Sequence, residues 1–250
     1  MPRSHHPARG FARRQPTGTS EFSARREQLS FALYLARIAG KRWADDASES
    51  RKIWGPMAVE LHLRWRDEVF RLLRDSERAV VLREAAISGR LKTWTEAMTD
   101  VVVEAFSDVG LRAAAKSHRL DLLPVNRNEY LSMDAMAFPP GEAAWQFPLA
   151  VVELENSADD DQVAYSLWKV LCVRTSLRVV FCYRKTEDAA SALVRRLRDD
   201  VIGSMKIDLR LGLEGETFII VGTRGEAGTF PYGFFKWWRL DRNTGTFSVA

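Results

Sequence analysis

The stretch PLAVVELE, residues 148–155, is apolar as far as Val152 and then carries two carboxylates, Glu153 and Glu155. A short, nearly continuous apolar run is typical of a strand that is covered on both faces of a sheet. Because residues two apart on a strand leave the same face, Glu153 and Glu155 are predicted to lie together at the carboxyl end of this strand. Ionised carboxylates without partners there would cost several kcal/mol each, so they require water, a cation or a metal ion.

The segments on either side of this strand predict the fold class. Their apolar residues recur with the period of a helix or of a strand, and loops rich in Pro, Asn and Gly separate them. The predicted helices span 93–108, 159–174 and 187–202, and the predicted strands span 111–117, 129–138, 148–155 and 177–183. A helix, three strands, a helix and a strand in this order predict an α/β fold, in which helices flank a mixed central sheet.

Three regions are expected along the chain. Residues 1–28 are expected to form a disordered basic tail, residues 29–89 a helical arm, and residues 90–250 the α/β domain. The arm contains a short apolar helix over 29–39 and a longer helix over 56–87. We expect the longer helix to pack on the core, although its surface could also serve a protein partner.

Two β-hairpins are predicted at the C-terminal end. MKIDLRLGL (205–213) alternates apolar and charged residues and is predicted to pair with TFIIVGT (217–223). FFKWWRL (234–240) and TFSV (246–249) are predicted to form the second hairpin around DRNTG. Alternation along this hairpin puts its two adjacent tryptophans on opposite faces, so one of them is expected in the core.

The composition, 46% apolar and 28% charged over 250 residues, excludes collagen-like, disulfide-rich and wholly disordered proteins. The tail holds six Arg against two Glu and so accounts for the net charge of +4, which leaves the body of the chain neutral. Cys172 and Cys182 lack the spacing of a zinc site and are expected to be buried thiols. The sequence shows no membrane-length apolar run and no secretory signal, so a cytoplasmic protein without a membrane partner is expected.

The acidic strand end has two candidate neighbours. If the strand over 129–138 pairs with that over 148–155, Asp134, Glu153 and Glu155 can converge on one oxygen-rich point. Such a point suits Mg²⁺ or Mn²⁺, because Mg²⁺ takes few protein carboxylates and otherwise binds water and phosphate oxygens. On the following helix Lys169 could either extend into solvent or aim at the carboxylates. Three other residues share its side of that helix: Gln162, Tyr165 and Ser166.

The residues M-D-A at 133–135 and V-E-L-E-N at 152–156, in this order of elements, resemble the PD-(D/E)XK nuclease superfamily, which has a restriction-endonuclease-like αβββαβ core. The resemblance implies that Asp134 and Glu153 bind Mg²⁺. Glu155 stands where the family usually has a lysine that activates water. Some restriction endonucleases of this fold carry E-X-E at this place, and other branches have the lysine on the next helix, where Lys169 stands.

The resemblance also implies supporting residues. The helix before the sheet often supplies an acidic residue in this family, and we expect Glu96 to do so, although a solvated helix face is the alternative. Gln162 and Tyr165 are one residue closer than in the Q-X3-Y pattern of the RecB-like branch. Away from this site, an aromatic and basic cluster could hold unpaired bases. Its members are Lys236, Trp237, Trp238 and Arg239.

These expectations favour a metal-dependent nuclease that cleaves DNA in preference to RNA, with Asp134, Glu153, Glu155 and Lys169 as catalytic residues. Cleavage of both strands usually requires two active sites, which a homodimer would supply. The alternative is a catalytically inactive module of the same fold that binds nucleic acid or a protein, with the helical arm as its contact surface. In a third interpretation the carboxylates have a structural role and pair only with Arg112, Arg178 or Lys169.

Overall fold

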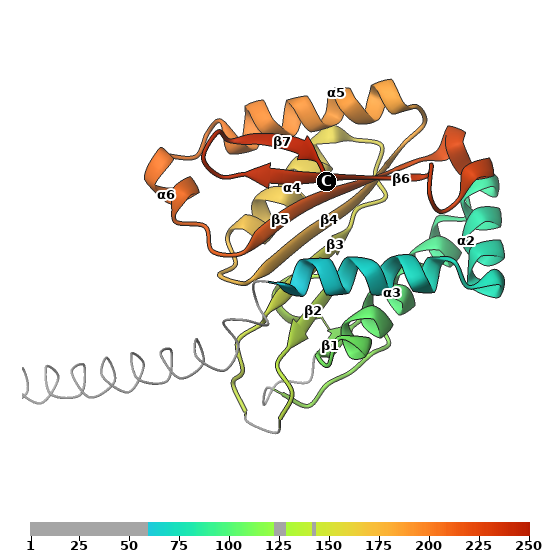
Figure 1. Cartoon of the computed structure of the whole chain (residues 1–250), viewed down its shortest axis with the longest axis horizontal. Helices are drawn as coiled ribbons and strands as arrows, with labels where there is room; N and C mark the ends of the chain where they lie inside the picture. Colours follow the sequence, from blue (N-terminus) through green and yellow to red (C-terminus); the bar gives the residue numbers. More distant parts are fainter. Residues whose placement is uncertain (1–59, 123–128, 142–143) are drawn as a thin grey trace, which may run out of the picture. The chain divides into compact units, whose positions relative to one another are not determined.

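A computed structural model gives the fold of the chain (Figure 1), and it describes residues 60–122, 129–141 and 144–250. The predicted tail over 1–28 and the predicted helix over 29–39 lie outside these residues. The central feature is a seven-stranded sheet whose strands follow one another in chain order, from β1 at one edge to β7 at the other.

The sheet is mixed, as predicted. Its strands are β1 (Arg112–Ala115), β2 (Ala135–Phe138), β3 (Ala150–Leu154), β4 (Leu177–Arg184), β5 (Glu216–Thr223), β6 (Phe235–Asp241) and β7 (Thr246–Val249). Strands β1 to β3 pair as antiparallel neighbours, β3 to β5 pair in parallel, and β5 to β7 pair antiparallel again. Each parallel step is made by a helix that crosses from one strand to the next.

Helices cover both faces of this sheet (Figure 1). The described α-helices are a helix over 60–73, α2 (Ser76–Ser88), α3 (Leu91–Asp108), α4 (Asp160–Leu171), α5 (Glu187–Leu197) and α6 (Ile207–Leu211). The segment from α3 through β1, β2, β3 and α4 to β4 therefore has the predicted order of a helix, three strands, a helix and a strand. The protein is an α/β protein with a mixed central sheet.

Two apolar cores lie on opposite faces of the sheet. The helix over 60–73, α2 and α3 contribute to the first core, and α4 and α5 contribute to the second. The first contains Trp65, Met98, Phe106, Phe181 and Trp237, and the second contains Val151, Leu167, Val180 and Leu193. Val151 belongs to the second core. Side chains alternate along a strand, so Glu153 and Glu155 leave the same face as Val151, towards α4.

The prediction of a single helix over 56–87 was wrong. Over the described residues of this segment the chain turns at Arg74 and Asp75 and forms two helices. The Asp75 side chain accepts a hydrogen bond from the backbone N–H of Arg78 and so caps α2. The turn lets both helices bury apolar residues in the same core, Trp65 from the first and Leu82 from the second. The described part of the predicted arm thus packs on the sheet, as expected.

The hairpin predicted from MKIDLRLGL and TFIIVGT was also wrong. Residues within the first segment form the short helix α6, and its apolar side chains Ile207, Leu209 and Leu211 are all exposed, so their alternation does not reflect burial. The second segment forms β5 as predicted, but β4 and β6 occupy both of its edges and leave no place for another strand. The hairpin of β6 and β7 is confirmed.

Three smaller findings complete the fold. The strand predicted over 129–138 is shorter, because η1 (Tyr130–Ser132) forms a tight turn before β2. Cys182 is buried as expected, but Cys172 is exposed just after α4, so its predicted burial was wrong. Within the described ranges, every helix is too short or too polar to cross a bilayer.

Candidate functional site

The pairing of β2 with β3 brings Asp134 and Glu153 together. Ala135 is the register partner of Val152. The next residues along the two antiparallel strands, Asp134 and Glu153, therefore lie opposite each other. Oδ2 of Asp134 accepts a 2.7 Å hydrogen bond from the backbone N–H of Leu154, which fixes this carboxyl at the end of β3. The predicted pairing of these two strands is confirmed.

Lys169 points at this pair from the last turn of α4. Its Nζ lies 2.7 Å from Oε2 of Glu153 and also donates a 2.7 Å hydrogen bond to the backbone oxygen of Ser132. Of the two orientations that the sequence allowed, solvent or the carboxylates, the structure has the second. Glu153 is only 4% exposed, and its Oε1 is buried without a hydrogen-bond partner among the residues that the structure describes.

Burial governs the protonation of both carboxyls. It raises the pKa of Glu153 to about 7, an increase that the negative charge of Asp134 adds to and the Lys169 ammonium opposes. Burial also raises the pKa of Asp134, against the hydrogen bond from the backbone of Leu154 and the charge of Lys169. Any further cation between the two carboxyls would favour their ionised forms. The cation that the structure places there is the Lys169 ammonium.

Glu155 leaves the same face as Glu153, as predicted, but one of its oxygens is already used. Oε1 accepts a 2.7 Å hydrogen bond from the backbone N–H of Ser157, and Oε2 lies 3.5 Å from the hydroxyl of Ser166. In the part of the chain that the structure describes, no group of three or more His, Cys, Asp or Glu side chains is arranged to hold a metal ion. The predicted convergence of Asp134, Glu153 and Glu155 on one point is thus met by Asp134 and Glu153, which lie opposite each other, while Glu155 accepts from the backbone of Ser157.

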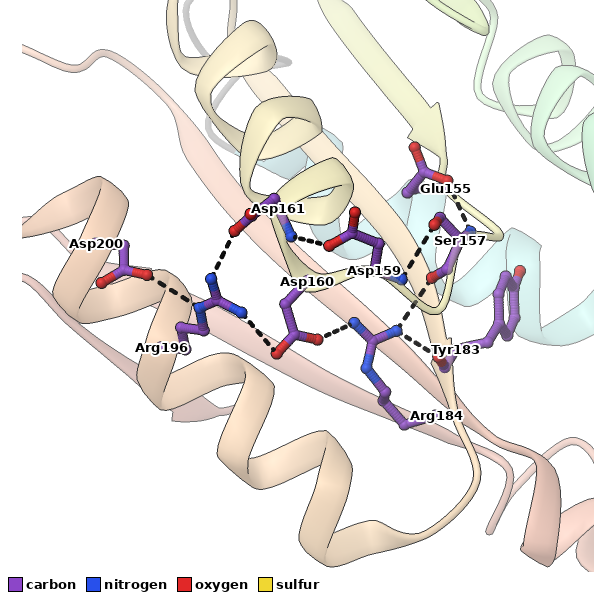
Figure 2. Close-up of polar contacts among 9 residues, drawn as sticks. All are labelled: Glu155, Ser157, Asp159, Asp160, Asp161, Tyr183, Arg184, Arg196 and Asp200. Atoms are coloured by element: carbon purple, nitrogen blue, oxygen red, sulfur yellow. Dashed lines mark hydrogen bonds and ion pairs between the residues drawn. The ribbon is translucent and has the colours of Figure 1, made fainter.

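Two arginines anchor the turn that joins β3 to α4 (Figure 2). Arg184, at the end of β4, donates to the backbone oxygen of Ser157 at 3.3 Å and forms an ion pair with Asp160. Arg196 of α5 pairs with Asp160 at 3.3 Å and also with Asp161. Asp160 and Asp161 lie in the first turn of α4, where the helix dipole favours negative charge. Their cationic partners stand on other elements, so nothing in the local sequence identifies them.

The residues predicted to support the site are both exposed. Glu96 is exposed on α3, 3.9 Å from Lys92 across one helical turn. Its neighbour Thr95 makes the contact between α3 and the end of β3, through a hydrogen bond from the side-chain nitrogen of Asn156 to its hydroxyl oxygen. Gln162 is exposed near the start of α4. Sequence reasoning missed Thr95, because helical spacing alone does not show which residue meets the end of another strand.

The aromatic and basic cluster on β6 does not form one open surface. Trp237 is buried in the first core, and Trp238 packs against the second, as the alternation predicted. Lys236 forms an ion pair with Glu187, and Arg239 forms a two-pronged ion pair with Glu216. Both cations are therefore already paired with carboxylates.

The purely structural interpretation of the carboxylates named three alternative partners, and one of them, Lys169, is paired with Glu153. Arg112 donates to the backbone oxygen of Gly141, and Arg178 donates to the backbone oxygens of Val173 and Glu214. Lys169 alone pairs with a carboxylate of the site.

Comparison of the chain with protein-family models, with curated proteins and with solved structures finds no match in any of the three.

The raised pKa of Glu153 predicts a pH-dependent effect of Glu153→Gln on stability. A carboxyl whose pKa rises on folding, here from 4.5 to about 7, stabilises the folded state fully below pH 4.5 and loses that contribution as the pH rises through 7. The variant does not titrate there. Its free energy of unfolding relative to the parent is therefore expected to rise between pH 5 and pH 8 by up to about 3 kcal/mol.

Urea denaturation of both proteins at a series of pH values measures this difference. Glu96→Gln, which removes a carboxylate from the exposed face of α3, is the control and is expected to show no comparable trend. A difference between parent and Glu153→Gln that stays constant from pH 5 to pH 8 would refute the assigned pKa.

Proposed function

We propose that this chain is a metal-dependent phosphodiesterase that cleaves nucleic acid, DNA in preference to RNA, at the pair Asp134 and Glu153 with Lys169 beside it. One observation carries the proposal. The buried carboxylate of Glu153 lies opposite Asp134 at the end of the central strand β3. Its Oε2 pairs with Lys169, and its Oε1 has no partner among the described residues. The order of elements from α3 to β4 supports it, because the resemblance to PD-(D/E)XK nucleases implies that order.

The residues present fit Mg²⁺ or Mn²⁺. Mg²⁺ is usually bound by one or two protein carboxylates and completes its shell with water and phosphate oxygens, which matches the pair Asp134 and Glu153. The unpartnered Oε1 of Glu153 is a further sign of fit, since a buried carboxylate oxygen without a partner is costly. When bound, the ion would polarise the phosphoryl group and lower the pKa of a bound water.

The chain's own side chains would do the remaining work. Asp134, held by the backbone N–H of Leu154, would bind from the β2 side, and Glu153 from the β3 side. Lys169 would stabilise the negative charge that develops on the phosphate, because its ammonium is fixed by Glu153 and by the oxygen of Ser132. In this arrangement Lys169 takes the place of the strand lysine that Glu155 replaces.

Incubation of the purified protein with labelled single-stranded and duplex DNA and RNA tests the proposal. Cleavage is expected with Mg²⁺ or Mn²⁺, and its loss is expected with EDTA and in Asp134→Asn. Asp100→Asn, which changes an exposed carboxylate of α3 that contacts His118, is the matched control and is expected to retain activity. Absence of cleavage with every substrate and both metals would refute the proposal.

A catalytically inactive module of this fold, which binds nucleic acid or a protein, is the second candidate. The ion pair between Lys169 and Glu153 favours it, because that pair already offsets the buried charge without a metal. Calorimetric titration with Mg²⁺ separates the two candidates. The enzyme is expected to give a binding heat that Glu153→Gln abolishes, whereas the inactive module is expected to give none.

A further inference from the structure

Two aromatic side chains stand exposed on the outer side of α4. Tyr165 and Trp168 are 56% and 54% exposed, and their rings stack on each other with centroids 5.9 Å apart and planes 24° apart. Single exposed apolar residues are common on protein surfaces. A stacked pair of large rings is a different feature, because the two rings hold each other in place while each remains more than half exposed.

This aromatic pair adjoins the candidate site through Lys169. The Lys169 ammonium lies 6.0 Å from the centre of the Tyr165 ring and 2.7 Å from Oε2 of Glu153. One side chain therefore contacts both the carboxylate and the aromatic surface. A nucleic acid whose phosphate is held at Asp134 and Glu153 through a divalent ion would extend across Lys169 onto the rings.

A third exposed apolar side chain, that of Leu131, stands on the turn before β2, one residue before the carbonyl that holds Lys169. Leu131 is 69% exposed, and it has a φ of 55°, a backbone conformation that is unfavourable for a residue with a Cβ. The next residue, Ser132, gives its backbone oxygen to the Lys169 ammonium. The same turn thus holds the lysine and presents an apolar side chain to solvent near it.

We propose that Tyr165 and Trp168 form a base-stacking surface that makes single-stranded nucleic acid the substrate class of this site, an inference that rests on the proposed function. Aromatic side chains bind unpaired bases of any sequence, because every base has a flat π-face. In a duplex these faces are stacked within the helix, and only base edges and backbone are accessible. The rings therefore discriminate between single strand and duplex, while the phosphate lies at Asp134 and Glu153.

Fluorescence anisotropy with labelled oligonucleotides tests the proposal on the full chain, with Ca²⁺ in place of Mg²⁺ so that a divalent ion at Asp134 and Glu153 can still hold a phosphate. The parent is expected to bind a single strand of DNA or RNA more tightly than the matching duplex. Trp168→Ala is expected to weaken single-strand binding about tenfold or more and to change duplex binding little. Trp168→Phe retains a ring and is expected to keep most of the affinity, which separates stacking from a general loss of structure.

Trp145→Ala is the matched control. Trp145 is also exposed, at 65%, but it precedes β3 at the opposite end of the β2 and β3 pair from Asp134 and Glu153. The proposal would be overturned if the parent bound single strand and duplex equally, or if Trp145→Ala weakened binding as much as Trp168→Ala. It would also be overturned if Trp168→Ala bound single strand as tightly as the parent, and the rings would then remain as a surface for a protein partner. Binding that depends on Trp168 in a protein that never cleaves would refute the proposed function and leave the stacking surface standing.

Discussion

Glu153→Gln is expected to lower the rate of metal-dependent cleavage about a thousandfold while the protein stays folded. Glutamine keeps the size of the side chain and an oxygen that can accept from Lys169, but it has no negative charge to bind a divalent ion. Electrostatic stabilisation by a bound metal contributes several kcal/mol to such reactions, and each 1.4 kcal/mol is about a factor of ten in rate. Single-turnover cleavage with Mg²⁺ in excess measures the loss at the chemical step.

Two comparisons make this result specific to the site. Glu155→Gln removes the neighbouring carboxylate on the same face, whose Oε1 holds the backbone of Ser157, and is expected to have a smaller effect than Glu153→Gln. The unfolding measurements on Glu153→Gln show whether the variant is folded at the pH of the assay. A folded Glu153→Gln variant that cleaves as fast as the parent would place the reaction elsewhere in the molecule.

The sequence was sufficient for the part of the site that depends on periodicity. The apolar run before Glu153 identified a central strand, and the period of two placed Glu153 and Glu155 on one face. Asp134 required one further assumption, that β2 and β3 are neighbours, and short connections make that arrangement common. Lys169 followed from its position on α4, although the choice between solvent and carboxylate needed the structure.

The sequence was not sufficient where contacts join elements that are far apart in the chain. Arg184 and Arg196 hold the start of α4 from β4 and α5, and Thr95 meets Asn156 from a helix on the other side of the sheet. Such contacts depend on the relative placement of elements, which local patterns do not encode. The strand predicted over MKIDLRLGL was wrong for a different reason. Alternation of apolar and charged residues produces a strand only if a sheet edge is free to pair with that segment, and both edges of β5 are occupied.

Trp65→Ala is expected to lower the free energy of unfolding by about 3 to 5 kcal/mol, the usual cost of deleting a large buried ring. Trp65 has no exposed surface and lies at the centre of an aromatic cluster. Its ring stacks on Phe106 at 5.1 Å, and it meets the edges of Phe181 at 6.4 Å and Trp237 at 6.0 Å. These partners come from α3, β4 and β6, so the cavity would open between a helix layer and the centre of the sheet.

Urea denaturation measures the loss of unfolding free energy. Two other variants on the same helix serve as comparisons. Trp65→Phe keeps an aromatic ring and removes an indole nitrogen that has no partner among the described residues, so its cost is expected to be clearly smaller. Leu63→Ala lies on the exposed side, at 42% exposure, and is expected to cost less than about 1 kcal/mol. A Trp65→Ala cost as small as that of Leu63→Ala would mean that the helix over 60–73 can leave the sheet without loss, as a detachable arm would. A large cost would make this helix part of the layer that supports β4 and β6, and a partner could then bind only its outer face.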